Sequence, residues 1–490
     1  MLTMRRIRTV VLLAVAFGSH GFLAWTHPER GNDPAERARS IEFRRHEFKE
    51  SPFGIHVFAT SEEDLPVFAA TGAKWVRTAC LRKMTEPEKG KYVWDMCDRQ
   101  IRGAELADAI PLTRLETQVV WAMSEKAKAR NQNAASTNAP MGDWTFVELP
   151  ADTERYARWV TACVERYDGD GVDDMPGLKG RHLHWQIENE LTWRWIGTKE
   201  ELVELFRITS EAIRRAEPEA KIVMGGMTGV ELLALADGYL GDQQYIFQGK
   251  AQSRDQVAAD SRVLRFRELN EYLLEKGASY FDIVSFHKYG DYQFVPGCVA
   301  WLRDKMAAHG YSKPTISTEM GGPFINRYEA YTESSHADAV IKYHVVSLAC
   351  GIEQIHWSTL FPTPQWGESF VNTSLVDIHK SKRPAYHTYT LLVLKLKGLR
   401  AAERMRLDDG DTGTRLYKFE TGNGVVFIAW SERINGRHLE FDIGAPSAKL
   451  TDVFGTERIV ATVDGKVTLD LISSPIFVEP IADTQSKSNS

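Results

Sequence analysis

Residues 183–190 read LHWQIENE, a short and largely apolar run that ends at two carboxylates, Glu188 and Glu190. A second run of the same kind lies in PTISTEMG, where residues 314–317 lead into Glu319. Short apolar runs without polar alternation are typical of parallel strands that are covered on both faces. Each stretch therefore predicts a buried strand with a glutamate at its C-terminal end.

Runs of this character recur along the chain and alternate with amphipathic helical segments, such as Tyr156–Tyr167. A capping box of Thr198 and Glu201 marks the start of another helix. The eight strand candidates are Phe53–Val57, Trp75–Arg77, Ile110–Leu115, Leu183–Ile187, Lys221–Gly225, Phe281–Phe286, Pro314–Ser317 and Gln354–Trp357. This order predicts an α/β fold, a (β/α)8 TIM barrel over residues 51–396, whose site lies at the C-terminal ends of the strands. Glu190 and Glu319 then share one rim.

After about Leu399 the pattern changes to short alternating runs, among them RLYKFE, GVVFIAW, HLEFDI and KVTLDLI. Gly, Asp and Asn separate them, and no long helical period remains. Residues 397–482 are therefore predicted to form a C-terminal antiparallel β-sandwich domain. The polar residues 483–490 are predicted to be a disordered tail.

The N-terminus has the pattern of a targeting segment. Basic residues at Arg5, Arg6 and Arg8 precede an apolar run, Val10–Phe17, and small residues follow it. Residues 1–25 are predicted to be a signal peptide or an N-terminal membrane anchor, and residues 26–50 a linker. We expect an exported protein, periplasmic or extracellular, with cleavage favoured over anchoring. An exported protein can form a disulfide, and Cys80 with Cys97 is the closest pair in sequence. The alternative is that all five cysteines are buried thiols.

Composition limits the classes of protein. The chain has 490 residues, of which 43% are hydrophobic and 26% are charged, which indicates a globular protein. The formal net charge is −6, so electrostatics give no reason to expect a nucleic-acid partner.

The two glutamate motifs resemble those of the clan A retaining glycoside hydrolases, which include families 5, 39 and 42. WQIENE is similar to family 42, and residues 88–101, EKGKYVWDMCDRQI, resemble a pattern that follows the second strand in this clan. Overall size and the β-rich appendage are most similar to family 39. The resemblance implies that Glu190 is the general acid/base and Glu319 the nucleophile, with no organic cofactor and a poly- or oligosaccharide substrate.

The chemistry of glycosidic cleavage agrees with this pair. A retaining enzyme needs carboxyl groups about 5–5.5 Å apart, whereas an inverting enzyme needs roughly 6.5–9.5 Å to admit water. Glu188 is an alternative acid, because positions 188 and 190 share a face of an extended strand. We prefer Glu190, which follows an asparagine as in the clan, and expect Glu188 to be its hydrogen-bonding neighbour.

Further residues are predicted to bind substrate or to tune the glutamates, each with ordinary packing or ion pairing as the alternative. Asn189 would donate to a sugar hydroxyl, and Arg77 would keep Glu319 ionised. Trp193 and Trp366 would stack on further sugar units, as would Trp195. The remaining candidates are His56, His287, Tyr289 and Trp357, the last as a platform under the reacting sugar.

One loop suggests a metal. YDGDGVDDMPG places Asp168, Asp170 and Asp173 among glycines, which resembles a calcium-binding loop without the closing glutamate of an EF-hand. A structural calcium ion is predicted there, with a solvated turn as the alternative. His182 and His184 form a second metal-like pair, but they precede a strand and so lie at the end of the barrel away from the chemistry.

Two other functions share these residues. A carbohydrate-binding protein that has lost turnover would keep the scaffold, and a transglycosylase would keep both glutamates. The sugar, the linkage and the anomeric configuration are open at this point.

Overall fold

The computed structural model describes residues 41–42, 51–56, 63–136, 146–241, 245–247, 250–322, 331–364, 371–407, 411 and 413–482. The predicted signal segment, the predicted tail and Trp366 lie outside these residues. Within the described ranges, no helix has both the length and the apolar character needed to cross a membrane.

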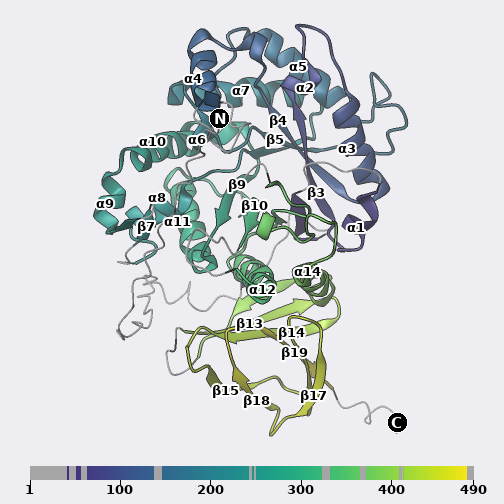
Figure 1. The fold of residues 1–490 in the computed structure, drawn as a ribbon, viewed down its shortest axis with the longest axis vertical. Helices are drawn as coiled ribbons and strands as arrows, with labels where there is room; N and C mark the ends of the chain where they lie inside the picture. Colours follow the sequence, from purple (N-terminus) through teal and green to yellow (C-terminus); the bar gives the residue numbers. More distant parts are fainter. Residues whose placement is uncertain are drawn as a thin grey trace, which may run out of the picture.

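Eight parallel strands among the described residues form the barrel (Figure 1). In chain order they are β2 (Phe53–His56), β3 (Trp75–Leu81), β4 (Ile110–Glu116), β5 (His184–Ile187), β6 (Lys221–Met224), β9 (Val284–Tyr289), β10 (Thr315–Gly321) and β11 (Ile355–Trp357). Sequential strands are neighbours, and β11 pairs with β2. Backbone bonds from Met224 N to Ile283 O (2.9 Å) and from His287 N to Met227 O (2.9 Å) join β6 to β9 and close the ring. The predicted barrel is confirmed, with a strand at each of the eight candidate runs.

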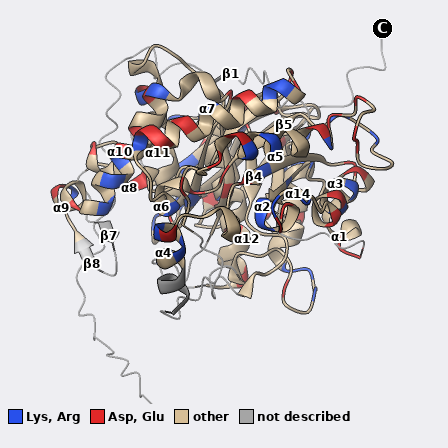
Figure 2. Ribbon diagram, turned by 90° about the horizontal axis from the view of Figure 1, so that it is seen from above, with Lys and Arg blue, Asp and Glu red and all other residues tan. Residues whose placement is uncertain are grey.

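Helices connect these strands and cover the barrel from outside. They are α1 (Leu65–Ala69), α2 (Arg82–Thr85), α3 (Asp95–Leu106), η1 (Val120–Ala122), α4 (Glu125–Ser136), α5 (Thr153–Glu165), α6 (Leu191–Arg194), α7 (Lys199–Ala216), α8 (Val230–Ala236), α9 (Arg254–Ala259), α10 (Ser261–Lys276), η2 (Ala278–Tyr280), η3 (Tyr292–Phe294), α11 (Val295–Ala308), α12 (Glu333–Ala349) and α14 (Pro384–Lys395). A short hairpin of β7 (Tyr245–Phe247) and β8 (Lys250–Gln252) precedes α9. Basic and acidic residues are interspersed along α3, α7 and α10 (Figure 2).

The inside of the barrel is filled in layers. An apolar cluster of Trp75, Leu112, Val223, Ile283 and Ile316 fills the interior. Because side chains alternate along a strand, positions two residues further on point inward as well. Polar side chains above this cluster therefore lie on the barrel axis, toward the C-terminal ends of the strands.

The C-terminal strands form the predicted sandwich. They are β12 (Ala401–Arg404), β13 (Thr414–Thr421), β14 (Gly424–Ser431), β15 (Arg437–Asp442), β16 (Ser447–Thr451), β17 (Glu457–Ala461), β18 (Lys466–Leu471) and β19 (Ile476–Ile481). The larger sheet also takes in β1 (Ile41–Glu42), from the stretch expected to be a linker, and β15 pairs with β18 apart from it. Leu416, Phe427, Leu439, Val467 and Val478 belong to the apolar core of this region.

The sandwich packs on helices α12 and α14 of the barrel (Figure 1). Thr388 of α14 donates to the carbonyl of Val453 at 2.7 Å, and Lys342 of α12 lies 2.8 Å from Glu432. Sandwich residues such as Phe419 and Trp430 belong to the same continuous apolar cluster as the barrel helices.

All five cysteines are described and free, so the Cys80–Cys97 disulfide is not formed in this structure. Cys80 and Cys97 are both buried, and burial raises the pKa of each thiol well above its ordinary value. Both behave as buried apolar side chains of the core.

Candidate active site

A sharp turn after β5 presents Glu190. The strand ends at Ile187, and Glu188 and Glu190 then adopt positive φ angles of 60° and 47°. Such left-handed backbone is costly for residues other than glycine and is held only where neighbours enforce it. Arg194 of α6 contributes, because its Nη1 donates to the carbonyl of Asn189 at 3.2 Å. Glu190 then directly precedes α6 and is 8% exposed.

Glu319 lies within β10, and its backbone is in register with His287 on β9. Arg77 Nη1 donates to Glu319 Oε1 at 2.5 Å, and the Tyr289 hydroxyl donates to Oε2 at 2.7 Å. Burial raises the pKa of this carboxyl, but the charges of His287 and Arg77, together with the Tyr289 hydrogen bond, outweigh burial. The pKa of Glu319 is therefore held well below its ordinary value, and the side chain is ionised.

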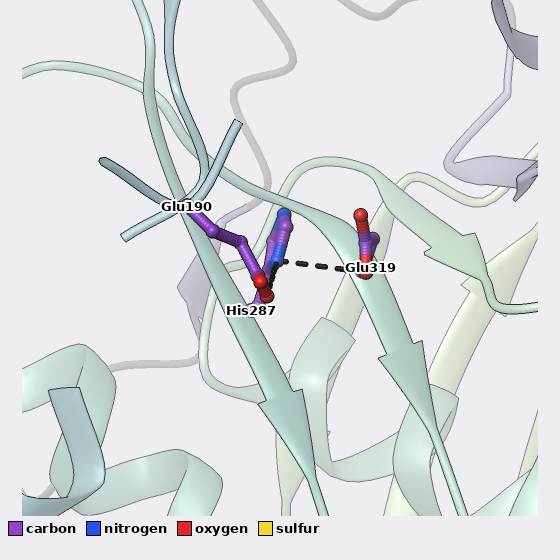
Figure 3. A group of neighbouring side chains, drawn as sticks. All are labelled: Glu190, His287 and Glu319. Atoms are coloured by element: carbon purple, nitrogen blue, oxygen red, sulfur yellow. Dashed lines mark hydrogen bonds and ion pairs between the residues drawn. The ribbon is translucent and has the colours of Figure 1, made fainter. Parts of the chain in front are cut away.

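The two glutamates face one another across His287 (Figure 3). His287 Nδ1 lies 2.7 Å from Glu190 Oε1 and 3.6 Å from Glu319 Oε2. One oxygen of each carboxylate and one nitrogen of His287 all lie within 4.8 Å of one another. This short separation is nearer to the carboxyl spacing of retaining glycosidases, about 5–5.5 Å, than to the roughly 6.5–9.5 Å of inverting ones.

Arg77 organises the floor of the site. It is 1% exposed, and besides Glu319 it donates from Nη2 to Asn189 Oδ1 at 2.6 Å and from Nε to Gln186 Oε1 at 3.0 Å. Since arginine only donates, Asn189 must turn its amide oxygen to Arg77. The amide NH₂ of Asn189 is then left to donate elsewhere, as the predicted contact to a sugar hydroxyl requires.

A buried hydrogen-bond chain fixes His287. Its Nε2 lies 3.0 Å from Thr318 Oγ1, which lies 2.7 Å from Ser285 Oγ. Gly226 makes room for the ring, because a Cβ at that position would lie 1.9 Å from His287 Nε2. The backbone after β6 and the residue before Glu319 thus both hold the histidine that contacts Glu190.

Glu188 is fully buried below the rim. Its Oε1 accepts from Thr117 N at 2.5 Å, while Oε2 has no hydrogen-bond partner among the residues that the structure describes. Burial, only partly offset by Arg194, raises the pKa of this carboxyl to about 7. Glu188 therefore joins the ends of β4 and β5, whereas Glu190 makes the contact to His287.

Two further predicted residues lie near the site. His56, at the end of β2, is 2% exposed, and its Nδ1 lies 3.8 Å from Glu319 Oε1. Burial and the charge of Arg77 hold the pKa of His56 well below its ordinary value, so the ring is neutral.

Trp193 in α6 is 45% exposed and packs edge-on against Phe266 at 5.1 Å, close in sequence to Glu190. Its neighbour Trp195 is buried and donates to Thr198 O at 2.7 Å, so it packs the loop instead of offering a surface.

The prediction for Trp357 is wrong. Its indole is fully buried and lies parallel to the rings of His336 and His344 of α12, at 6.0 and 5.7 Å. Its Nε1 donates to Thr373 O at 3.0 Å. A side chain held against α12 lies outside the barrel wall and cannot support a sugar on the barrel axis.

The aspartate loop is only partly as predicted. Donor atoms of Asp168, Asp170 and Glu165 lie within 4.8 Å of one another, and Asp173 is not part of this group. Burial, the largest effect, raises the pKa of Asp168 to about 6. The carboxylates of Asp168 and Asp170 also accept backbone N–H groups of the loop at 3.3 and 2.7 Å, as a solvated turn would. Calcium binding at this loop stays a prediction.

Sequence reasoning did not single out Gln186, Thr318 or Gly226. Gln186 shares a strand face with Glu188, and Thr318 directly precedes Glu319, so both were adjacent to recognised residues. Their roles depend on contacts across strands, which the sequence alone does not give.

Comparison with solved structures identifies barrels of the same fold. A family 39 glycoside hydrolase from Bacteroides cellulosilyticus WH2 superposes with a TM-score of 0.61 at 14% identity, covering 89% of this chain and 82% of that one. A glucosidase from Croceicoccus marinus gives 0.58 at 12% identity, with coverages of 88% and 97%. A GH30 endoxylanase from Clostridium papyrosolvens C71 gives 0.53 at 14% identity, with coverages of 89% and 97%. No family model matches the chain, and no curated protein matches it. At these identities the likeness shows a shared fold, the barrel with a β-rich appendage found in clan A glycoside hydrolases.

Proposed function

We propose that this protein is a retaining glycoside hydrolase that cleaves O-glycosidic bonds of a poly- or oligosaccharide. The carrying observation is the pair of carboxylates, with one oxygen from Glu190 and one from Glu319 within 4.8 Å. The fold shared with a glucosidase and an endoxylanase supports the class of reaction.

The proposed reaction has two displacements. In the first, the ionised Glu319 attacks the anomeric carbon while Glu190 gives its proton to the departing glycosidic oxygen. In the second, Glu190 takes a proton from water, the water oxygen bonds to the anomeric carbon, and the carboxylate of Glu319 is released. Arg77 and Tyr289 stabilise the charge of Glu319 before attack and after release.

The test is chemical rescue of two alanine variants, assayed with activated aryl glycosides. Glu319→Ala is expected to lose activity, and added azide is expected to restore part of it as a glycosyl azide of inverted configuration. Glu190→Ala is expected to give a glycosyl azide of retained configuration, chiefly with good leaving groups.

A matched control is Glu217→Ala. Glu217 is also buried and ion-paired, 2.7 Å from Arg181, but it follows α7 at the opposite end of the barrel. This variant is expected to keep activity at a comparable loss of stability. Rescue products with the opposite stereochemistry would refute the assignment, and sugar binding with neither turnover nor a trapped ester would favour a binding protein. Transfer of the glycosyl group to sugars in preference to water would identify a transglycosylase.

We also propose that the protein is exported, on the strength of the basic and apolar pattern of residues 1–25 alone. Expression of the full chain followed by cell fractionation and N-terminal sequencing tests this. A start after about residue 25 supports cleavage, the intact start in the membrane fraction supports an anchor, and the intact start in the cytoplasm contradicts export.

A further inference from the structure

Arg194 follows Glu190 closely in the chain and contacts the turn that carries it. Its Nη1 donates to the carbonyl of Asn189 at 3.2 Å, inside the turn, and its Nη2 donates to Glu116 Oε2 at 3.1 Å, at the end of β4. The side chain of Arg194 is 6% exposed, so water competes little for these contacts. Arg194 therefore joins the backbone next to Glu190 to the neighbouring strand of the barrel.

The turn needs such a connection because its backbone is strained. Glu188 and Glu190 lie on either side of Asn189, and both have left-handed φ angles. Left-handed backbone at residues other than glycine is costly and persists only where the surroundings enforce it. The donor from Arg194 thus acts at the centre of the strained segment.

The end of β4 holds this turn at more than one point. Glu188 N donates to Leu115 O at 2.9 Å, and Thr117 N donates to Glu188 Oε1 at 2.5 Å. Both of these contacts end at Glu188. The bridge through Arg194 reaches one residue further along the turn, to Asn189, and so acts where the other two contacts do not.

The anchor of this bridge is a permanently ionised carboxylate. Glu116 is nearly buried, and its oxygens lie 2.6 Å from Arg114 Nε and 3.1 Å from Arg194 Nη2. Burial raises the pKa of Glu116, but the charges of Arg114 and Arg194 outweigh burial, so the pKa falls to about 2. The carboxylate therefore stays charged, and able to hold Arg194, over the whole pH range of an ordinary assay.

Arg77 also holds Asn189, but it acts on both halves of the site. It donates to the side-chain oxygen of Asn189 at 2.6 Å and to the nucleophile Glu319 at 2.5 Å. A change at Arg77 thus disturbs both carboxylates. The hydrogen bond from Arg194 goes instead to the backbone of Asn189, so a change at Arg194 acts first on the segment of Glu190.

We propose that Arg194 is a positioning residue for the general acid, which holds the turn after β5 so that the carboxyl of Glu190 lies at the glycosidic oxygen. This inference rests on the proposed hydrolase function and adds a residue to that same site. Displacement of a reacting group by about 1 Å can cost on the order of 100-fold in rate. The loss falls on leaving groups that need a proton, and hardly on those that depart as stable anions.

The experiment compares kcat/KM of the full-length protein for two aryl glycosides of the sugar that the wild type cleaves best in a panel. The dinitrophenyl glycoside has a leaving group that departs without a proton, whereas the phenyl glycoside needs the acid. Because kcat/KM reports the first displacement alone, hydrolysis of the ester does not affect the comparison. Glu190→Ala is measured beside the Arg194 variants and is expected to show the largest selective loss on the phenyl glycoside.

Two variants test the side chain. Arg194→Met removes both contacts and is expected to lower kcat/KM roughly 10- to 100-fold for the phenyl glycoside and less than about 3-fold for the dinitrophenyl glycoside. Arg194→Lys keeps the positive charge beside Glu116 but lacks the planar fork that reaches in two directions. It is expected to melt near the wild-type temperature and to lose about 10-fold on the phenyl glycoside alone, which separates geometry from charge.

A matched control is Arg166→Met. Arg166 is also largely buried and lies 2.7 Å from Asp98, but it follows α5, whose C-terminal end leads into the start of β5 at the opposite end of the barrel. This variant is expected to lose stability and to change kcat/KM for both glycosides by the same factor.

The outcomes separate the two proposals. A loss confined to the phenyl glycoside in Arg194→Lys supports the inference, even if Arg194→Met does not fold. An equal effect of Arg194→Lys on both glycosides, or no effect, overturns the inference and leaves the hydrolase proposal standing. Glu190→Ala without a selective loss, or a wild type that cleaves no glycoside of the panel, refutes the proposed function itself.

Discussion

Glu188 and Glu190 differ in environment, and this difference predicts opposite behaviour of their glutamine variants. Glu188 is fully buried, and one of its oxygens has no hydrogen-bond partner within the described part of the chain, whereas Glu190 contacts His287 at the rim. Glu188→Gln is expected to keep its Thr117 N–H contact, because the amide oxygen can accept it. Activity of this variant is expected to stay within about 5-fold of the wild type. Glu190→Gln is expected to lose 100-fold or more, roughly the contribution of a general acid.

The pKa of the Glu188 carboxyl sets how much the free energy of unfolding changes with pH. Burial raises it from its ordinary 4.5 to about 7 in the folded protein. Between these values the folded state binds more protons than the unfolded state, so the free energy of unfolding falls as pH rises. Each pH unit is worth about 1.4 kcal/mol, so this carboxyl destabilises the wild type by about 3 kcal/mol above pH 7 relative to pH 4.5. The glutamine variant has no such dependence.

The assay is urea unfolding of the wild type and Glu188→Gln from pH 4.5 to pH 8, with activity measured on the same samples. The free energy of unfolding of the variant, relative to that of the wild type, is expected to rise by about 3 kcal/mol between pH 4.5 and pH 7. From pH 7 to pH 8 this difference is expected to stay constant. A constant difference, or one that falls with pH, would show that Glu188 is ionised and paired in the folded state. An inactive Glu188→Gln beside an active Glu190→Gln would exchange the two roles.

Other expectations follow from the same site and from the loops. Thr318→Val removes the hydroxyl beside His287 Nε2 and is expected to lower kcat roughly 5- to 10-fold with little change in KM. Thr318→Ser keeps a hydroxyl and is expected to retain most of the rate. Equal rates for both variants would argue against a role for the hydroxyl. Trp193→Ala is expected to raise KM roughly 3- to 10-fold for oligosaccharides and to leave small aryl glycosides unchanged, and an equal effect on both would assign it to packing. Millimolar calcium is expected to raise the melting temperature by roughly 2 °C in the wild type but not in Asp168→Asn, and identical melting in calcium and in chelator would favour the solvated turn.

The fold was predictable because its signals are local. Each barrel strand is a short apolar run, and every candidate run after the first ends where a polar or glycine residue follows, so the strands could be located without knowing their partners. One segment did not follow the prediction. The expected linker contributes β1 to the sandwich.

The site was less predictable, because the direction of a side chain depends on the register of its strand. Trp357 lies at the C-terminal end of β11, where sugar-binding residues are expected, yet the alternation along that strand turns His356 toward Gly54 and the barrel, and Trp357 toward α12. A shift by one residue reverses such an assignment. Arg77 and Glu319 were correctly expected to pair, since an arginine and a glutamate buried at the same end of a barrel have few other ways to be satisfied.

The sandwich also bears on the chemistry, because it holds the segment that follows β9. His287 and Tyr289 lie on that strand, and the next residues, Gly290–Tyr292, contact both the barrel helices and the sandwich. The hydroxyl of Tyr343 in α12 donates to Gly290 O, and the hydroxyl of Tyr292 donates to Glu432 and accepts from Trp430 Nε1 at 3.0 Å. Lys342 joins α12 to the same Glu432 at 2.8 Å. The segment that directly follows His287 and Tyr289 is therefore held in part by sandwich residues more than a hundred positions further along the chain.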